Sequence, residues 1–562
     1  HKVDVPASWA TAEDHKPETV LEGRPDTVKV VKTILNPIGR MDGYSLPVSA
    51  FAELPDGQFP LGASAYEKRG VAVTVPHWDE TKCIQCNNCA YVCPHATIRP
   101  FALTEEEVKA APAGARLVDV KAGKGKGVYK YMMAVSPLDC MGCGVCVGVC
   151  PTQAITMVPQ EQELPEQEVW NYMVNHVSEK KDMQDNTVKG SQFHKPLLEF
   201  SGSCAGCAET SYARLVTQLF GDRMYISNAT GCSSIWGGPA ATSPYTVTAE
   251  GRGPAWANSL FEDNAEHGLG MYTAQAVIRE SLANKVKEVM EKTTCDERKA
   301  ACQAWLDTYN DGEANKAATK ALIENLEAKV CCDTVKDILS KKEYLSKKSV
   351  WIFGGDGWAY DIGFGGVDHV LAQNKDVNVF VFDTEVYSNT GGQASKASNI
   401  GQVAQFAAAG KETKKKSLSE IAMSYGYVYV AQVAMGANPA QTIKAITEAE
   451  AYHGPSLIIG YAPCEMHSIK GGMTNCQAEM KKAVECGYWN LFRFDPSKET
   501  GKFQLDSKAP KDGYQEFLMN EARYSRLTRE FPERATDLFA KNEAAAKERW
   551  EHLNKLVEMY KD

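Results

Sequence analysis

Two runs of four cysteines share one spacing, and this spacing constrains the fold more than any other feature of the chain. Each run follows the pattern C-x2-C-x2-C-x3-C-P, and the closing prolines are Pro94 and Pro151. Two residues between successive thiolates let three sulfurs curl around one face of a small inorganic centre. The first run contains Cys83, Cys86, Cys89 and Cys93, and the second contains Cys140, Cys143, Cys146 and Cys150.

This spacing is typical of [4Fe–4S] clusters in two-cluster bacterial ferredoxins, where the last cysteine of each run ligates the other cluster. Two clusters with exchanged fourth ligands are therefore expected: Cys83, Cys86, Cys89 and Cys150 for one, and Cys140, Cys143, Cys146 and Cys93 for the other. Zinc is the main alternative, but it usually takes C-x2-C pairs and not triplets. A disulfide framework fits less well, because thiols this dense in a large chain suit a reducing compartment.

Composition narrows the class of protein. The chain has 562 residues, is 44% hydrophobic and carries a net charge of −10, which predicts several domains with sizeable cores and no nucleic-acid partner. The sequence contains neither an apolar run long enough to span a bilayer nor a visible signal peptide. We therefore expect a cytoplasmic protein with no membrane partner. The chain begins at His1 and not at Met, which suggests a fragment or a processed product.

Changes in composition divide the chain into segments. The first is rich in Pro and Gly, with an expected turn at residues 36–39, and an insertion at about 102–132 separates the two cysteine runs. A second, mostly helical insertion rich in Lys and Glu covers 266–345. The expected divisions are a connecting arm (1–75), a ferredoxin-like domain (76–160), a linker (161–197), an α/β domain (198–490) and a C-terminal helical region (491–562).

From about residue 198, short apolar runs alternate with helical stretches such as 440–451. Strands alternating with helices indicate a parallel sheet covered on both faces. The expected fold is a doubly wound α/β domain plus an α+β two-cluster ferredoxin-like domain. The strands of the α/β domain are predicted at residues 224–227, 349–353, 377–382, 427–433 and 457–461.

Two polar segments follow neighbouring predicted strands. Gly355-Asp356-Gly357 comes after the strand at 349–353, and Asp383 to Gln393 comes after the strand at 377–382. Ligands of open α/β folds bind at the carboxyl edge of the sheet, and Mg²⁺ prefers oxygen ligands that include phosphate. Glycines also let the backbone approach a phosphate closely. Together the two segments resemble the thiamine diphosphate motif, with Asp383-Thr384 where the usual form has paired asparagines.

That resemblance implies specific binding residues. The Asp356 carboxylate, the Thr384 hydroxyl and the Val386 carbonyl would bind Mg²⁺, and Asn389 would lie near the diphosphate. Gly355 and Gly357 complete the cofactor-binding set on this side of the site.

Four further cysteines lie near ends of predicted strands or open the α/β region. Cys204 and Cys207 open that region, Cys232 follows the strand at 224–227, and Cys464 follows the strand at 457–461. Such positions can converge at one edge of a doubly wound sheet, beside the proposed cofactor. From spacing alone, these thiols could hold a third cluster or zinc, form a redox-active pair, or pack in the core.

The segments 83–94, 204–207, 231–238 and 355–393 together resemble pyruvate:ferredoxin oxidoreductase, in the C-terminal half of the single-chain enzyme. The resemblance covers nearly the whole chain in order. It implies a third [4Fe–4S] cluster near the cofactor, with Cys232 beside the cofactor. The ligands of that cluster map onto Cys204, Cys207, Cys232 and Cys464.

The same resemblance implies oxidation of pyruvate with coenzyme A to acetyl-CoA and CO2, with electrons leaving through three clusters to ferredoxin or flavodoxin. The glutamate that activates the aminopyrimidine is expected in the N-terminal half of the enzyme, so no catalytic residue is assigned here. That half is an expected partner, and a homodimer is expected. Two alternatives stay open: another 2-oxo acid, such as 2-oxoglutarate or an aryl-pyruvate, or an electron carrier whose α/β domain has lost its cofactor.

For most of the remaining polar residues and cysteines we predict a structural role and no part in binding or catalysis. His467 is predicted to bond to backbone, and Lys414-Lys415-Lys416 to form a solvated face. Glu209 and Glu465 lie in candidate segments without an assigned role. Six other cysteines are predicted to be buried thiols: Cys295, Cys302, Cys331, Cys332, Cys476 and Cys486.

Overall fold

The structure is a computed structural model that describes residues 5–11, 21–121, 126–239 and 242–562. It divides into one unit from His1 to Pro60 and a second from Leu61 to Asp562. Each unit is described by itself. No helix among the described residues is both long and apolar enough to cross a membrane.

The first unit is built around a helical segment. Helix α1 (Pro25–Val30) continues through a π-helical turn, η2 (Val31–Leu35), into α2 (Asn36–Gly39). The prediction of a turn at 36–39 is therefore wrong. Pro37 has no N–H to donate, and the wider π turn just before it fits a helix that must lose one hydrogen bond there. Short 3-10 turns flank this segment: η1 (Ala7–Thr11), η3 (Gly43–Ser45) and η4 (Val48–Phe51).

The cysteine runs lie in a small module of the second unit, after a short 3-10 turn, η5 (Ala63–Tyr66). Strand β1 (Thr74–Trp78) pairs antiparallel with β5 (Ile155–Pro159), so the two ends of the module meet. Between the runs, β2 (Ile98–Leu103), β4 (Lys130–Val135) and β3 (Val118–Asp119) form a sheet in that order. The short helices α3 (Asn88–Val92) and α5 (Val145–Gly148) carry one cysteine of each run.

Helix α4 (Glu105–Ala110) begins the insertion with a capping box between Thr104 and Glu107, which satisfies two amides at the helix start. Residues 122–125 of the insertion lie outside the described residues. The segment after β5 is helical and leads toward the larger sheet. Its elements are α6 (Gln160–Glu163), α7 (Glu166–His176), η6 (Lys181–Met183) and α8 (Val188–Ser191).

The larger sheet has the strand order β13-β12-β10-β11-β9-β8-β6-β7. Its central strands are parallel, and β12 and β13 add an antiparallel edge. The predicted α/β class is confirmed. The strands are β6 (Met224–Ala229), β7 (Ala255–Ser259), β8 (Ser349–Gly355), β9 (Asn378–Asp383), β10 (Tyr429–Val433), β11 (Ser456–Tyr461), β12 (Phe492–Phe494) and β13 (Phe503–Leu505).

Helices pack around this sheet and bury its central strands. Every residue of β9 is buried, as expected for a parallel strand covered on both faces. The Tyr212 ring of α9 packs 5.4 Å from the Phe380 ring of β9, and its hydroxyl donates to the Tyr461 carbonyl at 3.0 Å. The helices are α9 (Ala208–Phe220), α10 (Cys232–Gly237), α15 (Phe364–Ala372), α16 (Leu418–Met423), α17 (Pro439–Ala451) and α18 (Cys476–Glu485).

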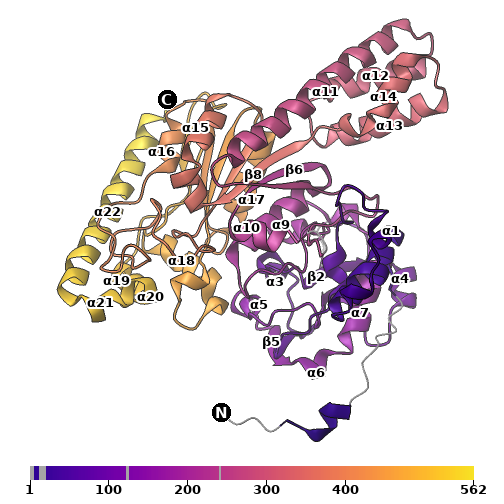
Figure 1. Ribbon diagram of the computed structural model, residues 1–562. Helices are drawn as coiled ribbons and strands as arrows, with labels where there is room; N and C mark the ends of the chain where they lie inside the picture. The colour runs from indigo at the N-terminus through magenta and orange to yellow at the C-terminus, as the bar shows by residue number, and fades with distance from the viewer. Residues whose placement is uncertain (1–4, 12–20, 122–125, 240–241) are drawn as a thin grey trace. The chain divides into compact units, whose positions relative to one another are not determined.

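The predicted helical insertion forms a bundle with its own core. Helix α11 (Asn264–Lys292) begins against the sheet, where its Asn264 side chain bonds to Ser227 of β6, and then extends beyond it. Helices α12 (Asp296–Asp307), α13 (Ala314–Ala328) and α14 (Asp333–Ser340) pack on the far part of α11, away from the sheet (Figure 1). Their buried side chains include Val286, Trp305 and Leu322.

The C-terminal helices lie at the opposite side of this unit from the bundle (Figure 1). They are α19 (Tyr514–Met519), α20 (Ala522–Ser525), α21 (Leu527–Glu530) and α22 (Pro532–Met559). The long helix α22 is anchored by Asn542, whose side-chain amide donates to the Ile400 carbonyl at 2.7 Å.

Candidate functional site

The three oxygen ligands predicted for magnesium lie together at the carboxyl edge of the sheet. Strands β8 and β9 are parallel neighbours, with Gly355 opposite Phe382, so the residues that follow them meet. The Thr384 backbone N–H and hydroxyl oxygen lie 3.1 and 2.9 Å from one oxygen of the Asp356 carboxylate. The same hydroxyl is 2.9 Å from the Val386 carbonyl oxygen. Ser395 donates to the other Asp356 oxygen at 2.5 Å.

The turn after β9 has a left-handed residue at its centre. Glu385 has a φ of 58°, a conformation that is uncommon for a residue other than glycine and that surrounding contacts must stabilise. Its buried carboxylate accepts hydrogen bonds from four groups. They belong to Arg523 (2.8 Å), Lys415 (3.0 Å), Tyr488 (2.5 Å) and Asn399 (2.9 Å).

Lys415 corrects one prediction. Only 13% of its side chain is exposed, and Nζ lies 2.7 Å from an oxygen of Asp383 and 3.0 Å from an oxygen of Glu385. The solvated lysine face is therefore wrong for this residue, although Lys414 is exposed and pairs with Glu548 on α22. The ammonium of Lys415 offsets part of the negative charge that two buried carboxylates bring to the turn.

One pocket contains every residue predicted to bind the cofactor. Its wall includes predicted residues from both sheet-edge segments together with the start of α10. The pocket is lined by Glu209, Thr230, Gly231, Cys232, Ser233, Phe261, Gly355, Asp356, Gly357, Trp358, Thr384, Val386, Tyr387, Ser388, Asn389 and Thr390. At Gly357, a Cβ would lie 2.4 Å from the Tyr387 ring, so packing alone requires a glycine here.

The oxygen atoms of Asp356, Thr384 and Val386 in this pocket are suitable ligands for a hard divalent cation. Burial, and then the neighbouring Asp383 charge, raise the pKa of the Asp356 carboxyl to about 8. A divalent cation next to this group would favour its ionised form. A carboxylate, a hydroxyl and a carbonyl are also the oxygen ligands that Mg²⁺ accepts. The residues present therefore fit magnesium and a diphosphate.

The third set of cysteines gathers beside the same pocket. Burial raises the pKa of the Cys232 thiol, and the charges of Glu209, Cys464, Cys207 and Cys204 raise it further, so these groups are neighbours. Cys207 directly precedes α9, Cys232 begins α10 and Cys464 follows β11. Four thiols far apart in the sequence thus lie around one region, and Cys232 also lines the pocket.

Glu209 lines the pocket, although no role was predicted for it. It is buried in the first turn of α9, and its carboxylate accepts a hydrogen bond from Trp236 Nε1 at 3.3 Å. Burial raises the pKa of this carboxyl to about 7. The only available signal was a carboxylate two residues after a candidate ligand, and such a residue is often a solvated helix start.

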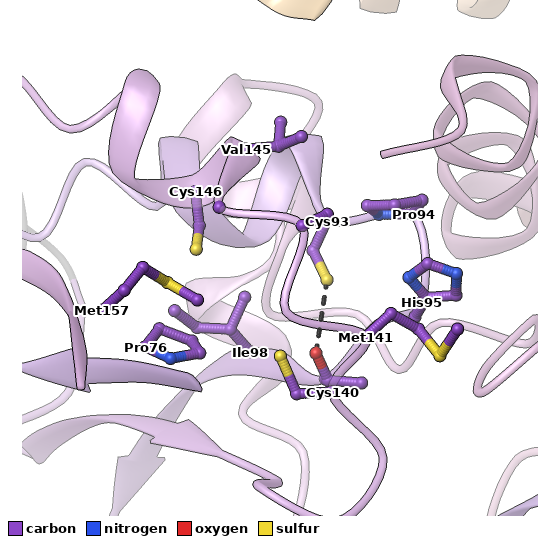
Figure 2. Close-up of a pocket in the computed structure, with 13 residues that line it drawn as sticks. Pro76, Cys93, Pro94, His95, Ile98, Cys140, Met141, Val145, Cys146 and Met157 are labelled. Carbon is purple, nitrogen blue, oxygen red and sulfur yellow. Dashed lines mark hydrogen bonds between the residues drawn. The ribbon is translucent and has the colours of Figure 1, made fainter. Parts of the chain in front are cut away.

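The second cysteine run surrounds a cavity together with the last cysteine of the first run. Cys93, Cys140, Cys143 and Cys146 all line it. Figure 2 shows the sulfurs of Cys93, Cys140 and Cys146 pointing into this space. Burial raises the pKa of the Cys140 thiol to about 12 and that of Cys143 to about 11.

The first run gathers in the same manner with the last cysteine of the second. Burial raises the pKa of the Cys86 thiol, and the neighbouring thiols Cys83 and Cys150 raise it further. The structure therefore brings together the residues of each predicted exchanged set. Within the described ranges, no three His, Cys, Asp or Glu side chains are arranged to hold a single metal ion. The clusters are therefore inferred from which thiols lie together and not from preformed coordination.

The three cysteine sets follow one another toward the pocket. The pKa of Cys146, in the second set, is raised by burial and also by Cys89 of the first set. The second and third sets are joined where the Gly206 amide hydrogen-bonds to the Cys143 thiol. Cys232 of the third set then forms part of the pocket wall.

The remaining predictions have mixed outcomes. His467 is confirmed as a histidine bonded to backbone, because its Nε2 lies 2.7 Å from the Thr384 carbonyl. The cysteines Cys302, Cys476 and Cys486 are buried, as predicted. The prediction of burial is wrong for the other three, which are exposed: Cys295, Cys331 and Cys332.

Comparison with known families matches three parts of the chain. Residues 82–154 match a 4Fe-4S dicluster domain, and residues 339–459 match the C-terminal TPP binding domain of thiamine pyrophosphate enzymes. Residues 13–72 match the EKR domain, a domain of unknown function. The chain therefore belongs to the class of proteins that join a thiamine diphosphate domain to a two-cluster iron–sulfur domain.

Similarity to characterised proteins covers the whole chain. It is 52% identical to pyruvate:ferredoxin oxidoreductase of Moorella thermoacetica, over 99% of this chain and 48% of the relative. It is 49% identical to pyruvate-flavodoxin oxidoreductase of Klebsiella pneumoniae, with the same coverage of each chain. The chain spans about half the length of these relatives and corresponds to their C-terminal portion. Over nearly its whole length, the chain is similar to one half of pyruvate:ferredoxin and pyruvate-flavodoxin oxidoreductases.

Proposed function

We propose that this chain is the cofactor-binding and electron-transferring half of a pyruvate:ferredoxin or pyruvate:flavodoxin oxidoreductase. The proposed reaction oxidises pyruvate with coenzyme A to acetyl-CoA and CO2. The observation that carries this proposal is the succession of three cysteine sets that ends in the wall of the Asp356 pocket. A pocket for a decarboxylating cofactor would thereby have a route for electrons out of it.

The pocket residues would hold the cofactor in a defined position. Asp356, Thr384 and Val386 would bind Mg²⁺, and Asn389 in the same pocket would contact the diphosphate. Gly355 and Gly357 would keep the backbone close to it. When bound, thiamine diphosphate supplies the electron-rich carbon chemistry by which a 2-oxo acid loses CO2. The protein contributes binding and orientation.

The cysteine sets would hold three [4Fe–4S] clusters. Cys204, Cys207, Cys232 and Cys464 would ligate the one beside the pocket, and the two exchanged sets would ligate the others. Oxidation of a 2-oxo acid releases two electrons, whereas each cluster carries one at a time. Clusters in series would therefore let the electrons leave the pocket in separate steps.

Several requirements fall to other parts of the enzyme. The chain spans about half the length of its relatives, and the glutamate that activates the cofactor is assigned to the N-terminal half. Pyruvate selection and most coenzyme A contacts are assigned there as well. Ferredoxin or flavodoxin would accept the electrons, and the enzyme would act in the cytoplasm as a homodimer.

The proposal is tested on the full 562-residue chain after anaerobic reconstitution with iron, sulfide, thiamine diphosphate and Mg²⁺. Three clusters require about twelve irons and as many sulfides per chain, and calorimetry should detect thiamine diphosphate binding that depends on Mg²⁺. Pyruvate oxidation should appear only after the N-terminal half is added. Full turnover by the chain alone would contradict the assignment to a half-enzyme. Twelve irons without cofactor binding would support an electron carrier.

A further inference from the structure

Two adjacent cysteines are exposed in the helical bundle, away from the cofactor pocket and the three cysteine sets. Cys331 and Cys332 lie between α13 and α14, and both are exposed. Their sulfurs are 3.9 Å apart. A third exposed cysteine, Cys295, precedes α12 and has no neighbouring cysteine in the sequence.

A fixed cation lies beside one sulfur of the pair. The Arg298 guanidinium lies 3.0 Å from the Cys331 sulfur. Arg298 is itself buried and held in place by the side chain of Asn325 and the carbonyls of Asn325 and Lys329, at 3.0, 3.1 and 2.8 Å. The cation is therefore fixed beside the sulfur, and a nearby cation is a feature of reactive cysteines.

Cys332 has a second source of stabilisation. It immediately precedes α14, and hydrogen bonds from the backbone amides of Val335 and Thr334 lower the pKa of its thiol. The pKa of Lys292, at the end of α11, is raised mainly by its hydrogen bond to Glu288 and further by the charge of Cys332. An exposed thiol with a lowered pKa beside a second thiol is the arrangement found in redox-sensitive cysteines.

We propose that Cys331 and Cys332 form a reversible dithiol–disulfide site that peroxides oxidise. In the first step the Cys332 thiolate attacks one peroxide oxygen, the O–O bond breaks, and hydroxide leaves and takes up a proton as water. Cys332 becomes a sulfenic acid. The Cys331 sulfur then attacks that sulfur, the S–O bond breaks, and the leaving hydroxide takes up the Cys331 thiol proton as a second water. In total, two thiols and one hydrogen peroxide give one disulfide and two waters.

The adjacency of the pair makes the disulfide easy to reverse. Consecutive Cα atoms are about 3.8 Å apart, whereas most disulfides span Cα atoms at least about 4.4 Å apart. A bridge between neighbours is therefore strained, and strained, exposed disulfides are the ones that thiols reduce readily. Cys302, which is buried in the same bundle, is shielded from both reactions.

The test uses the full cluster-loaded chain under anaerobic conditions. One equivalent of hydrogen peroxide is added, free thiols are alkylated, and peptides are analysed by mass spectrometry. Iron content is measured before and after, so that cluster damage is recognised. The peptide with Cys331 and Cys332 should lose two hydrogen atoms and regain them with dithiothreitol, while Cys295 stays alkylated.

Conservative variants separate the two roles. In Cys331→Ser, Cys332 should stop at a sulfenic acid that dimedone traps, and Cys332→Ser should remove that product. Thiol-alkylation rates of the unsubstituted chain supply a measurement that does not depend on folding of the variants, and Cys332 should react faster than Cys295. Equal alkylation rates of the three exposed cysteines, or no bridge before Cys295 is oxidised, would overturn the proposal.

Discussion

The Nε2 atom of His467 lies 2.7 Å from the carbonyl oxygen of Thr384. His467 comes three residues after Cys464, a candidate cluster ligand, and Thr384 is a candidate magnesium ligand. This bond therefore joins the loop of one centre to the loop of the other. His467 is completely buried, and its other ring nitrogen faces Glu521 at 3.6 Å. Neither loop can shift far without the other.

Replacing His467 should weaken cofactor binding without removing any proposed ligand. His467→Ala would leave the buried Thr384 carbonyl without its donor, which costs about 1–3 kcal/mol. We expect the dissociation constant for thiamine diphosphate with Mg²⁺ to rise about tenfold, as measured by calorimetry. His467→Gln should restore part of the affinity. His453→Ala, at an exposed histidine paired with Asp376, serves as the control, and an equal effect there would count against the coupling.

Asp356→Asn should separate cofactor binding from stability. The change removes the carboxylate proposed to bind Mg²⁺, so calorimetry should detect no Mg²⁺-dependent thiamine diphosphate binding. Because burial already raises the pKa of Asp356 to about 8, a neutral amide should not lower the melting temperature of the cofactor-free chain. Unchanged cofactor affinity would exclude Asp356 as a ligand, and a large fall in melting temperature would indicate a structural role instead. Asp376→Asn, at the ion pair with Lys347, is the matched control.

Cys464→Ser should remove one cluster and leave two. If Cys464 ligates the third cluster, iron should fall from about twelve to about eight atoms per chain, with a matching loss of sulfide. Cys476→Ser provides the control, since Cys476 is a buried thiol outside the predicted sets. The third cluster would have to be abandoned if both variants kept the same iron content.

The stability of the chain should fall with rising pH through the titration of Glu479. Burial, and then the charge of Glu521, raise the pKa of Glu479 to about 7 from its ordinary value of 4.5. The folded chain therefore holds a proton that the unfolded chain releases, and this contribution is complete below about pH 4.5 and lost as the pH passes 7. Glu479→Gln should raise the melting temperature at pH 8 more than at pH 5. Glu485→Gln, at a half-buried residue of the same helix that pairs with Lys511, provides the control, and an equal pH dependence there would contradict the assignment to Glu479.

The predictable parts of the fold and site depend on local sequence. The strands ending at Gly355 and Asp383 appear as short apolar runs, and parallel neighbours bring their carboxyl ends together. The strand pattern therefore predicts a shared sheet edge, and the resemblance to the thiamine diphosphate motif supplied the choice of Asp356, Thr384 and Val386 as ligands there. The spacing within each cysteine run is equally local.

The features that sequence reasoning missed depend on partners far along the chain. Most of the Lys415 side chain is covered because its ammonium pairs with Asp383 and Glu385, although its lysine neighbours indicated a solvated face. Arg523 donates a hydrogen bond to Glu385, which lies 138 residues away in the sequence. No periodic pattern in the sequence predicts such a long-range ion pair. Glu209 lines the pocket because α9 packs beside α10, a contact that local sequence does not predict.

The placement of Cys93 with the second run and Cys150 with the first has a consequence for maturation. Neither set of four thiols exists until both runs have folded against each other, so building one cluster would hold in place the fourth thiol of the next. Filling of the two sites would then be cooperative. During iron limitation a population of chains would divide into empty and doubly loaded molecules, with few singly loaded ones between them.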